Sequence, residues 1–425
     1  MKTNENSESM STGRLPLSGM RVIELTHAWA GPLCGMMLAD MGAEVIKVES
    51  PAQKTEARGG SPYTGGESVI FMMTHRNKKS VTLDVKSPRG KEIFFDLVRT
   101  ADALIQNMRP GALKKMGLSY EDLKKINPRL IYTSVSGYGR TGPDANRAGV
   151  DQVAIAATGL AATTMGDSVD TPVALGTPVC DYMAAMWACQ GTLCAYIARG
   201  ATGEGQKVDA SLLEAGLSLM IGPIAMHFHN PSYTGYQTWI NGPSEFILAG
   251  DNRYVSVFAS YPALWDRFIG AIQIPELTDE PKFKSRDGRT KNVKELRAVL
   301  RKIFSEKPAA HWVKLLSEAG VPVSLVNTIG EAIDNPQVNA LGMLKEQNHP
   351  TAGPIHVLGV PVTLSETPGT IRTPAPLLGE HTFEVLSSVG LKDSELQDLI
   401  KQRVISTAQT PETMKNADQL KGKVA

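Results

Sequence analysis

One aspartate stands at the start of a long apolar segment, in a position where a carboxylate could react. Asp181 follows Gly176 and Pro178, and most residues from Tyr182 to Ile197 are apolar. An apolar run of this length predicts a buried helix with Asp181 as its only acid. Unpaired N–H groups and the helix dipole favour an anion at a helix start, so we expect this carboxylate to be ionised.

Two interpretations of Asp181 are open at this point. Aspartate is common as an N-cap, so its role could be limited to starting the helix. A carboxylate that is ionised, fixed in direction and shielded from bulk water can also act as a nucleophile. The context that the rest of the chain provides has to decide between them.

Composition limits the classes of function. The 425 residues suffice for two or three domains, and 44 Lys and Arg balance 43 Asp and Glu, which gives no case for a nucleic-acid or membrane-surface partner. The four cysteines show no metal-ligand spacing, so we expect no metal and a reduced, cytoplasmic protein. Residues 1–16 are predicted to be a disordered leader, and no uninterrupted apolar run reaches membrane-spanning length.

The segments before Asp181 alternate between strand and helix patterns. Strands are predicted at Met20–Leu25 and Ala43–Glu49, with the helix Leu33–Met41 between them. The alternation continues with further strands and helices at Ser80–Val85, Pro88–Thr100, Ala103–Gln106, Tyr120–Ile126 and Leu130–Ser136. Strands separated by helices predict an α/β fold with a parallel, doubly wound sheet. No strand leads into a G-x-G-x-x-G turn, so a nicotinamide or flavin site lacks motif support.

The composition changes after residue 225. A Tyr-, Asn-, Gly- and Pro-rich stretch is followed by a strand and by charged amphipathic helices at Trp265–Ile272, Val293–Phe304 and Ala309–Ala319. This region, 226–330, is predicted to be a second, smaller domain. Strands and closing helices follow it.

Four separated segments resemble one family. They are Gly31–Glu49, Asn107–Leu113, the Gly-x-Pro-x-x-Asp pattern that ends at Asp181, and Pro376–Thr382. In this order and spacing they are similar to the class III CoA-transferases, the group of formyl-CoA transferase and carnitine CoA-transferase. The likeness runs from about residue 17 to about residue 402.

The resemblance implies a fold that periodicity does not reveal. A large Rossmann-like domain would be built from both chain ends, 17–225 and 331–425, with the small α+β domain 226–330 between them. Two subunits would form an interlocked dimer, either a homodimer or a related hetero-oligomer.

The resemblance also implies site residues. Asp181 falls on the family's catalytic aspartate. The positions that would contact CoA are Trp29, Ala30, Leu83, Lys86, Asn107, Met108, Lys115 and Met116. The lysines, with Arg109, are suited to phosphates, and Leu83 and Met108 could enclose the adenine.

The implied reaction moves CoA from an acyl-CoA donor to a free carboxylic acid. It would pass through a mixed anhydride on Asp181 and an aspartyl-CoA thioester. CoA esters would be substrates, and no cofactor would be bound permanently.

The chain departs from the family pattern at several positions. Trp29 replaces a polar residue, Ser50 replaces a basic one, and Ala185 stands where glycine is frequent. The glycine-rich loop that covers the aspartate in the family has only Asn241-Gly242-Pro243 as a counterpart.

Other functions remain as alternatives. An α-methylacyl-CoA racemase has a Gly-His-Asp triplet where this chain has Gly149-Val150-Asp151, and valine cannot carry a proton, which leaves His27, His227 or His229 as substitutes. The chain could also be the CoA-binding subunit of a heteromeric CoA-transferase. An oxidoreductase ranks last because the glycine fingerprint is missing.

Several side chains are candidates for the acceptor pocket. A second carboxylate on a dicarboxylic acid could meet one of four basic side chains: Arg140, Arg147, His227 and His229. Trp29 or Tyr236 would favour an aromatic acid instead.

Overall fold

The computed structural model describes residues 14–52, 58–164, 171–231, 244–273, 277 and 280–408. The chain divides into two compact units. One comprises Met1–Thr158, Leu175–Leu219 and Leu341–Ala425, and the other Gly159–Ala174 and Met220–Ala340. The first unit thus includes segments near both chain ends, while the domain boundaries at 226 and 330 stay predictions.

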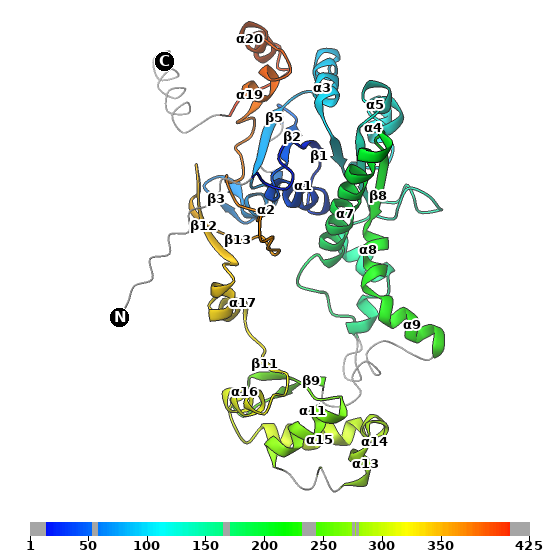
Figure 1. The fold of residues 1–425 in the computed structure, drawn as a ribbon, viewed down its shortest axis with the longest axis vertical. Coiled ribbons are helices and arrows are strands. Elements are labelled where there is room, and N and C mark those ends of the chain that lie inside the picture. Colours follow the sequence, from blue (N-terminus) through cyan, green and yellow to red (C-terminus); the bar gives the residue numbers. More distant parts are fainter. Residues whose placement is uncertain are drawn as a thin grey trace. The chain divides into compact units, whose positions relative to one another are not determined.

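The first unit is built on a parallel sheet, shown in Figure 1. Its six strands follow the order β5-β2-β1-β6-β7-β8, and every described pair is parallel. They are β1 (Arg21–Leu25), β2 (Glu44–Glu49), β5 (Lys78–Thr82), β6 (Ala103–Gln106), β7 (Ile131–Ser136) and β8 (Lys207–Ser211). The predicted α/β class with a parallel sheet is therefore confirmed. The strand order reverses direction at β1 and β6, and such a switch point is where open α/β sheets bind ligands.

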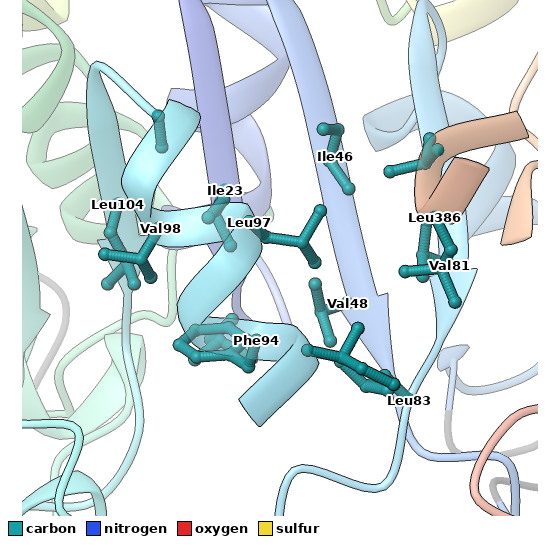
Figure 2. Packing of buried hydrophobic residues seen from close by; sticks show 14 of the residues in the cluster. Ile23, Ile46, Val48, Val81, Leu83, Phe94, Leu97, Val98, Leu104 and Leu386 are labelled. Carbon is teal, nitrogen blue, oxygen red and sulfur yellow. The ribbon is translucent and has the colours of Figure 1, made fainter. Parts of the chain in front are cut away.

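One face of the sheet packs on a core that draws on distant parts of the sequence. Helix α3 (Pro88–Thr100) is capped by Ser87 and places Phe94, Leu97 and Val98 against Ile23 and other strand residues (Figure 2). Helices α19 (Thr382–Ser387) and α20 (Asp393–Lys401) add Leu386 and Leu396 to the same cluster. Apolar burial thus joins the C-terminal segment to the N-terminal strands.

Helices α1 (Ala30–Asp40) and α7 (Val179–Thr202) pack against each other beside the sheet. The buried residues of α7 are mainly small, including Ala184, Ala185 and Ala188. The expectation that this helix is buried all round is wrong within this chain, because Met186 and Trp187 are exposed and Ile197 is 76% exposed.

The second unit has its own core around a three-stranded antiparallel sheet of order β11-β10-β9. Amphipathic helices pack on it, as the sequence predicts. Its elements are a 3₁₀ turn (Ala161–Thr164), α9 (Ile221–His229), β9 (Ser244–Leu248), β10 (Tyr254–Phe258), α11 (Pro262–Ile272), α13 (Pro281–Lys284), α14 (Arg286–Lys291), α15 (Val293–Phe304), α16 (Ala309–Glu318), β11 (Val323–Leu325), α17 (Ile329–Ile333) and α18 (Pro336–Ala340).

The remaining elements belong to the first unit. They are β3 (Tyr63–Thr64), β4 (Glu67–Ser68), α2 (Val69–Thr74), α4 (Ala112–Lys115), α5 (Tyr120–Ile126), α6 (Asp151–Ala157), α8 (Leu212–Leu219), β12 (Leu344–His349) and β13 (Gly353–Leu358). Among the described residues, no helix is long and apolar enough to cross a membrane. Nor does that part of the chain bring three or more His, Cys, Asp or Glu side chains together as a metal site would.

Candidate active site

Asp181 is the third residue of α7, and it does not cap that helix. Pro178 occupies the N-cap position and makes no side-chain cap hydrogen bond. The cap comes from Asp151, the first residue of α6, whose Oδ1 accepts the N–H of Cys180 at 2.8 Å and the N–H of Asp181 at 3.1 Å. The N-cap interpretation of Asp181 is therefore wrong, and its carboxylate is not needed to start the helix.

The environment of Asp181 makes the carboxyl group more basic than usual. Burial is the largest cause and the negative charge of Asp151 the second, and together they raise its pKa to about 6. The backbone N–H of Ala30 acts on the Asp181 carboxyl in the opposite direction and lowers the pKa in part. The lower pKa expected from the position at a helix start is therefore not found. With a pKa near 6, the ionised form of Asp181 still outnumbers the protonated form by about ten to one at pH 7.

The turn between β1 and α1 supplies the other wall around Asp181. Ala30 is the first residue of α1 and is buried, and Trp29 occupies the N-cap position before it. The Trp29 ring lies 5.8 Å from the ring of Tyr182, the neighbour of Asp181. The helix start of α1 and the first turn of α7 therefore converge on one carboxylate.

Asn107 holds this turn across the switch point of the sheet. It follows β6, and its Oδ1 accepts the N–H of His27 at 2.9 Å while its Nδ2 donates to the His27 carbonyl at 2.7 Å. Ala28, which follows His27, has a φ of +59°, in the left-handed region that residues with a side chain seldom adopt. The turn thus has a definite, constrained geometry.

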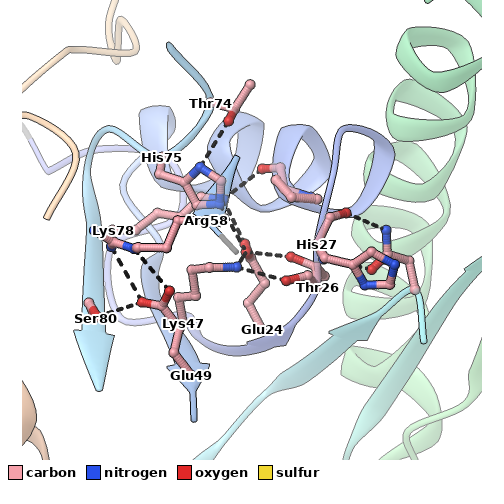
Figure 3. Close-up of polar contacts among 12 residues, drawn as sticks. Glu24, Thr26, His27, Lys47, Glu49, Arg58, Thr74, His75, Lys78 and Ser80 are labelled. Carbon is pink, nitrogen blue, oxygen red and sulfur yellow. Dashed lines mark hydrogen bonds and ion pairs between the residues drawn. The ribbon is translucent and has the colours of Figure 1, made fainter. Parts of the chain in front are cut away.

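A buried charge cluster holds the turn at its two ends (Figure 3). Glu24 on β1 pairs with Lys47 on β2 at 3.3 Å and with Lys78 on β5 at 2.7 Å. Lys47 also donates to the Thr26 carbonyl at 2.8 Å, and Lys78 to the Pro32 carbonyl at 2.7 Å.

Burial and pairing act in opposite directions within this cluster. Burial raises the pKa of the Glu24 carboxyl, but the two lysines outweigh it and hold that pKa below its ordinary value. Burial lowers the pKa of Lys78 to about 8, against the opposing effect of Glu24. Helix α1 lies so close above that a Cβ at Gly35 would be 2.0 Å from Glu24 Oε2, so glycine is required there.

The predicted CoA contacts follow the carboxyl ends of β1, β5 and β6. Lys86 lies after β5 and Lys115 at the end of α4, and both are exposed. Met108 and Met116 are partly buried against the core. Leu83 is only 1% exposed and belongs to that core, so the expectation that it encloses the adenine is wrong for this conformation of the chain.

Among the candidate acceptor residues, Trp29 lies beside Tyr182, but the described contacts do not bring the basic candidates to Asp181. Arg140 lies 3.7 Å from Asp209, and Arg147 pairs with Asp144 at 3.4 Å. His227 and His229 belong to the second unit. Tyr236 and the segment Asn241-Gly242-Pro243 lie outside the described residues.

Sequence reasoning missed Asp151 as a cap and the cluster of Glu24, Lys47 and Lys78. A signal was present, because charged residues inside strands predicted to be buried on both faces need buried partners. Asp151 gave no comparable signal, since its partners are backbone N–H groups 29 and 30 residues further on.

Comparisons with known proteins agree on one family. Residues 17–382 match the family model of CoA-transferase family III. The human succinyl-CoA:glutarate CoA-transferase is 34% identical over 93% of this chain and 91% of its own length. The beta subunit of succinyl-CoA–L-malate CoA-transferase from Chloroflexus aurantiacus is 33% identical over 93% of this chain and 99% of its own.

A solved structure extends the likeness to the fold. The crystal structure of a CAIB/BAIF family protein from Brucella suis matches with a TM-score of 0.78 at 29% identity. The match covers 89% of this chain and 100% of that one.

Proposed function

Because this chain belongs to CoA-transferase family III, we propose that it moves CoA from an acyl-CoA donor to a free carboxylic acid, with Asp181 as the nucleophile. CoA esters are its substrates, and the reaction needs no permanently bound cofactor. One thioester replaces another, so the bond energies nearly cancel.

The reaction has four balanced steps. The Asp181 carboxylate attacks the donor thioester, which gives an aspartyl–acyl mixed anhydride and CoA thiolate. The thiolate attacks the aspartyl carbonyl, which releases the donor acid and leaves an aspartyl-CoA thioester. The acceptor carboxylate attacks this thioester to form a second anhydride and free the thiolate. The thiolate then attacks the acceptor's carbonyl, which gives the new CoA ester and restores Asp181.

The environment of Asp181 is the observation that carries the proposal. The carboxylate is not needed as a cap because Asp151 serves that role, and burial and the charge of Asp151 make it more basic, an effect that the N–H of Ala30 offsets in part. A nucleophile gains from higher basicity as long as it stays ionised. An N–H aimed at the reacting carboxyl can also stabilise the oxyanion of each tetrahedral intermediate.

CoA would bind along the carboxyl ends of β1, β5 and β6. Lys86 and Lys115 are exposed there and would meet the phosphates. In this reading Trp29 and Ala30 lie next to the thioester end of the ligand, since both adjoin Asp181.

We also propose an interlocked dimer of subunits that act in the cytoplasm. The apolar side chains that α7 and α8 expose within one chain support a partner: Met186, Trp187, Ile197, Leu217 and Leu219. A related subunit could take the place of the second copy, as the name of the Chloroflexus relative indicates for that protein.

The racemase alternative requires a second acid or base near the substrate's α-carbon. His27 is the candidate in the β1–α1 turn, where burial, Lys47 and Arg109 lower its pKa. Racemase activity would exchange the α-proton with deuterated water without moving CoA.

The test is incubation of the purified protein with several acyl-CoA donors and a panel of dicarboxylic and aromatic acids, followed by mass spectrometry of the CoA esters. We expect a new CoA ester for at least one pair. Hydroxylamine added during turnover should modify one peptide, the one that contains Asp181. A protein that is active but leaves that peptide unmodified would refute the covalent mechanism.

A further inference from the structure

Asn107 is already engaged within the chain, although the resemblance assigns it to CoA. Its amide oxygen accepts the N–H of His27 at 2.9 Å, and its amide nitrogen donates to the His27 carbonyl at 2.7 Å. An amide that pairs with both backbone groups of one residue fixes that residue's position and orientation. The two bonds join the end of β6 to the end of β1, across the switch point.

The peptide held in this way leads directly to Asp181. Ala28 follows His27 in the left-handed region, and surrounding contacts have to maintain that conformation. The turn then reaches Asp181: the Trp29 ring lies 5.8 Å from the ring of Tyr182, α1 packs on α7, and the N–H of Ala30 lowers the pKa of the Asp181 carboxyl. The direction of this N–H therefore depends on how the His27 peptide is held.

We propose that Asn107 is a positioning residue that sets the β1–α1 turn so that the Ala30 N–H points at the Asp181 carboxylate. This inference rests on the proposed role of Asp181 as the nucleophile. Lys47 and Lys78 bind the carbonyls of Thr26 and Pro32, at the two ends of the turn. Asn107 supplies the side-chain contacts to the peptide between them.

Close packing supports the same role. A Cβ at Gly31 would lie 3.1 Å from Cγ of Asn107 and 2.6 Å from Cγ2 of Thr26. The first turn of α1 is thus pressed against the side chain that holds the preceding peptide, so displacing either one shifts the other.

The groups around Asp181 determine how its pKa changes when the β1–α1 turn is disturbed. Asp151 of α6 and Cys180 and Tyr182 of α7 are the titratable neighbours, and the N–H of Ala30 comes from α1. The remaining acids on the packed helices are bonded elsewhere: Asp40 of α1 to Arg76, and Glu214 of α8 to Ser211. The Ala30 N–H lowers the pKa of Asp181, so a misdirected N–H lets that pKa rise.

The experiment compares Asn107→Ala with the wild-type protein in two measurements. One is kcat from about pH 5 to 8, and the other is the affinity for an acyl-CoA ester by calorimetry. We expect the acid limb of kcat to move to higher pH, with kcat at pH 6 reduced roughly two- to fivefold, and the affinity to change less than about threefold. An unmoved acid limb with weakened CoA-ester binding would overturn the proposal and make Asn107 a CoA contact.

Asn127→Ala is the matched control. Its Nδ2 also bonds two backbone carbonyls, those of Val98 at 2.9 Å and Ala101 at 2.8 Å, but none in the β1–α1 turn. The acid limb of kcat should stay in place in this variant. An equal shift in Asn127→Ala would mean that the shift in Asn107→Ala comes from general loosening of the fold, which would overturn the proposal.

Gly31→Ala displaces the same turn but keeps the amide of Asn107, and it is the test to use if Asn107→Ala does not fold. It should shift the acid limb in the same direction, and an unmoved limb would count against the proposal. Failure of the proposed function would be distinguishable, because the wild-type protein would then give no modified Asp181 peptide.

Discussion

The carboxylate of Asp151 accepts the backbone N–H of Asp181 at 3.1 Å, while its charge adds to burial in raising the pKa of the Asp181 carboxyl to about 6. Asp151 therefore caps α7, and the carboxylate of Asp181 is left available for substrate. Two carboxylates in different environments commonly divide roles in this way.

Asp181→Asn separates chemistry from folding. We expect transfer to fall by roughly a thousandfold or more, because an amide cannot form the anhydride. The variant should be at least as stable as the wild-type protein. Folding raises the pKa of Asp181 to about 6, so the protonated carboxyl favours the folded state at low pH. This stabilisation is lost as the pH rises through about 6 and the group ionises. A neutral side chain avoids the loss, worth on the order of 1 to 3 kcal/mol at neutral pH. Mass spectrometry and thermal unfolding measure the two effects, with Asp398→Asn on the exposed face of α20 as the control.

The pH profile of kcat should rise through about pH 6, because the ionised carboxylate is the nucleophile. Asp151→Asn keeps an oxygen that can cap α7 but removes the neighbouring charge. Its acid limb should therefore move to lower pH, in the direction opposite to the shift expected for Asn107→Ala. A profile that stays in place would show that the charge of Asp151 has no influence on turnover.

Replacing both Lys86 and Lys115 with alanine should weaken acyl-CoA binding by about 2 to 4 kcal/mol if each makes one charge-assisted hydrogen bond. Calorimetry with a CoA ester measures this effect. Removing two exposed lysines elsewhere, Lys302 and Lys314, is the control and should leave the affinity unchanged. Equal affinities in all three proteins would assign both residues to the solvated surface.

Glu24→Gln should destabilise the protein by about 3 to 5 kcal/mol, because it leaves Lys47 and Lys78 buried without their carboxylate. Urea denaturation measures the free energy of unfolding. Arg99→Ala removes an ion pair to Asp96 on the exposed side of α3 and should cost less than about 1 kcal/mol. Similar losses in both variants would contradict the role of the buried cluster.

Light scattering should return a dimer or a larger assembly. The proposal rests on the exposed apolar residues of α7 and α8, which a second chain would cover. A stable species near the chain mass of 45.7 kDa at micromolar concentration would count against it.

Much of the fold was predictable because short apolar strand segments alternate with helix patterns along the chain. Helix α3 has the predicted bounds, Pro88–Thr100, with Ser87 as its cap, and β6 matches Ala103–Gln106. The apolar run after Asp181 was harder to interpret. Sequence alone does not show which of its apolar side chains are buried within the chain and which, like Trp187, are exposed.

The candidate site was predictable only in part. Asp181 stands out by its position before an apolar helix, but the residues that tune and surround it come from distant segments. Asp151 caps α7 by binding its backbone N–H groups, which no sequence pattern predicts. The left-handed residue of the turn is Ala28, whereas a sequence pattern would predict that conformation for a glycine. Such contacts depend on tertiary packing, which single-sequence patterns do not encode.

The cluster beneath the β1–α1 turn also bears on how the chain folds during synthesis. Glu24 and Lys78 are 54 positions apart, so β1 leaves the ribosome well before the strand that carries its strongest partner. Burying a carboxylate without that partner is costly, and β1 should therefore remain hydrated until β5 arrives. The turn that faces Asp181 would then take its final shape only when β5 has joined the sheet.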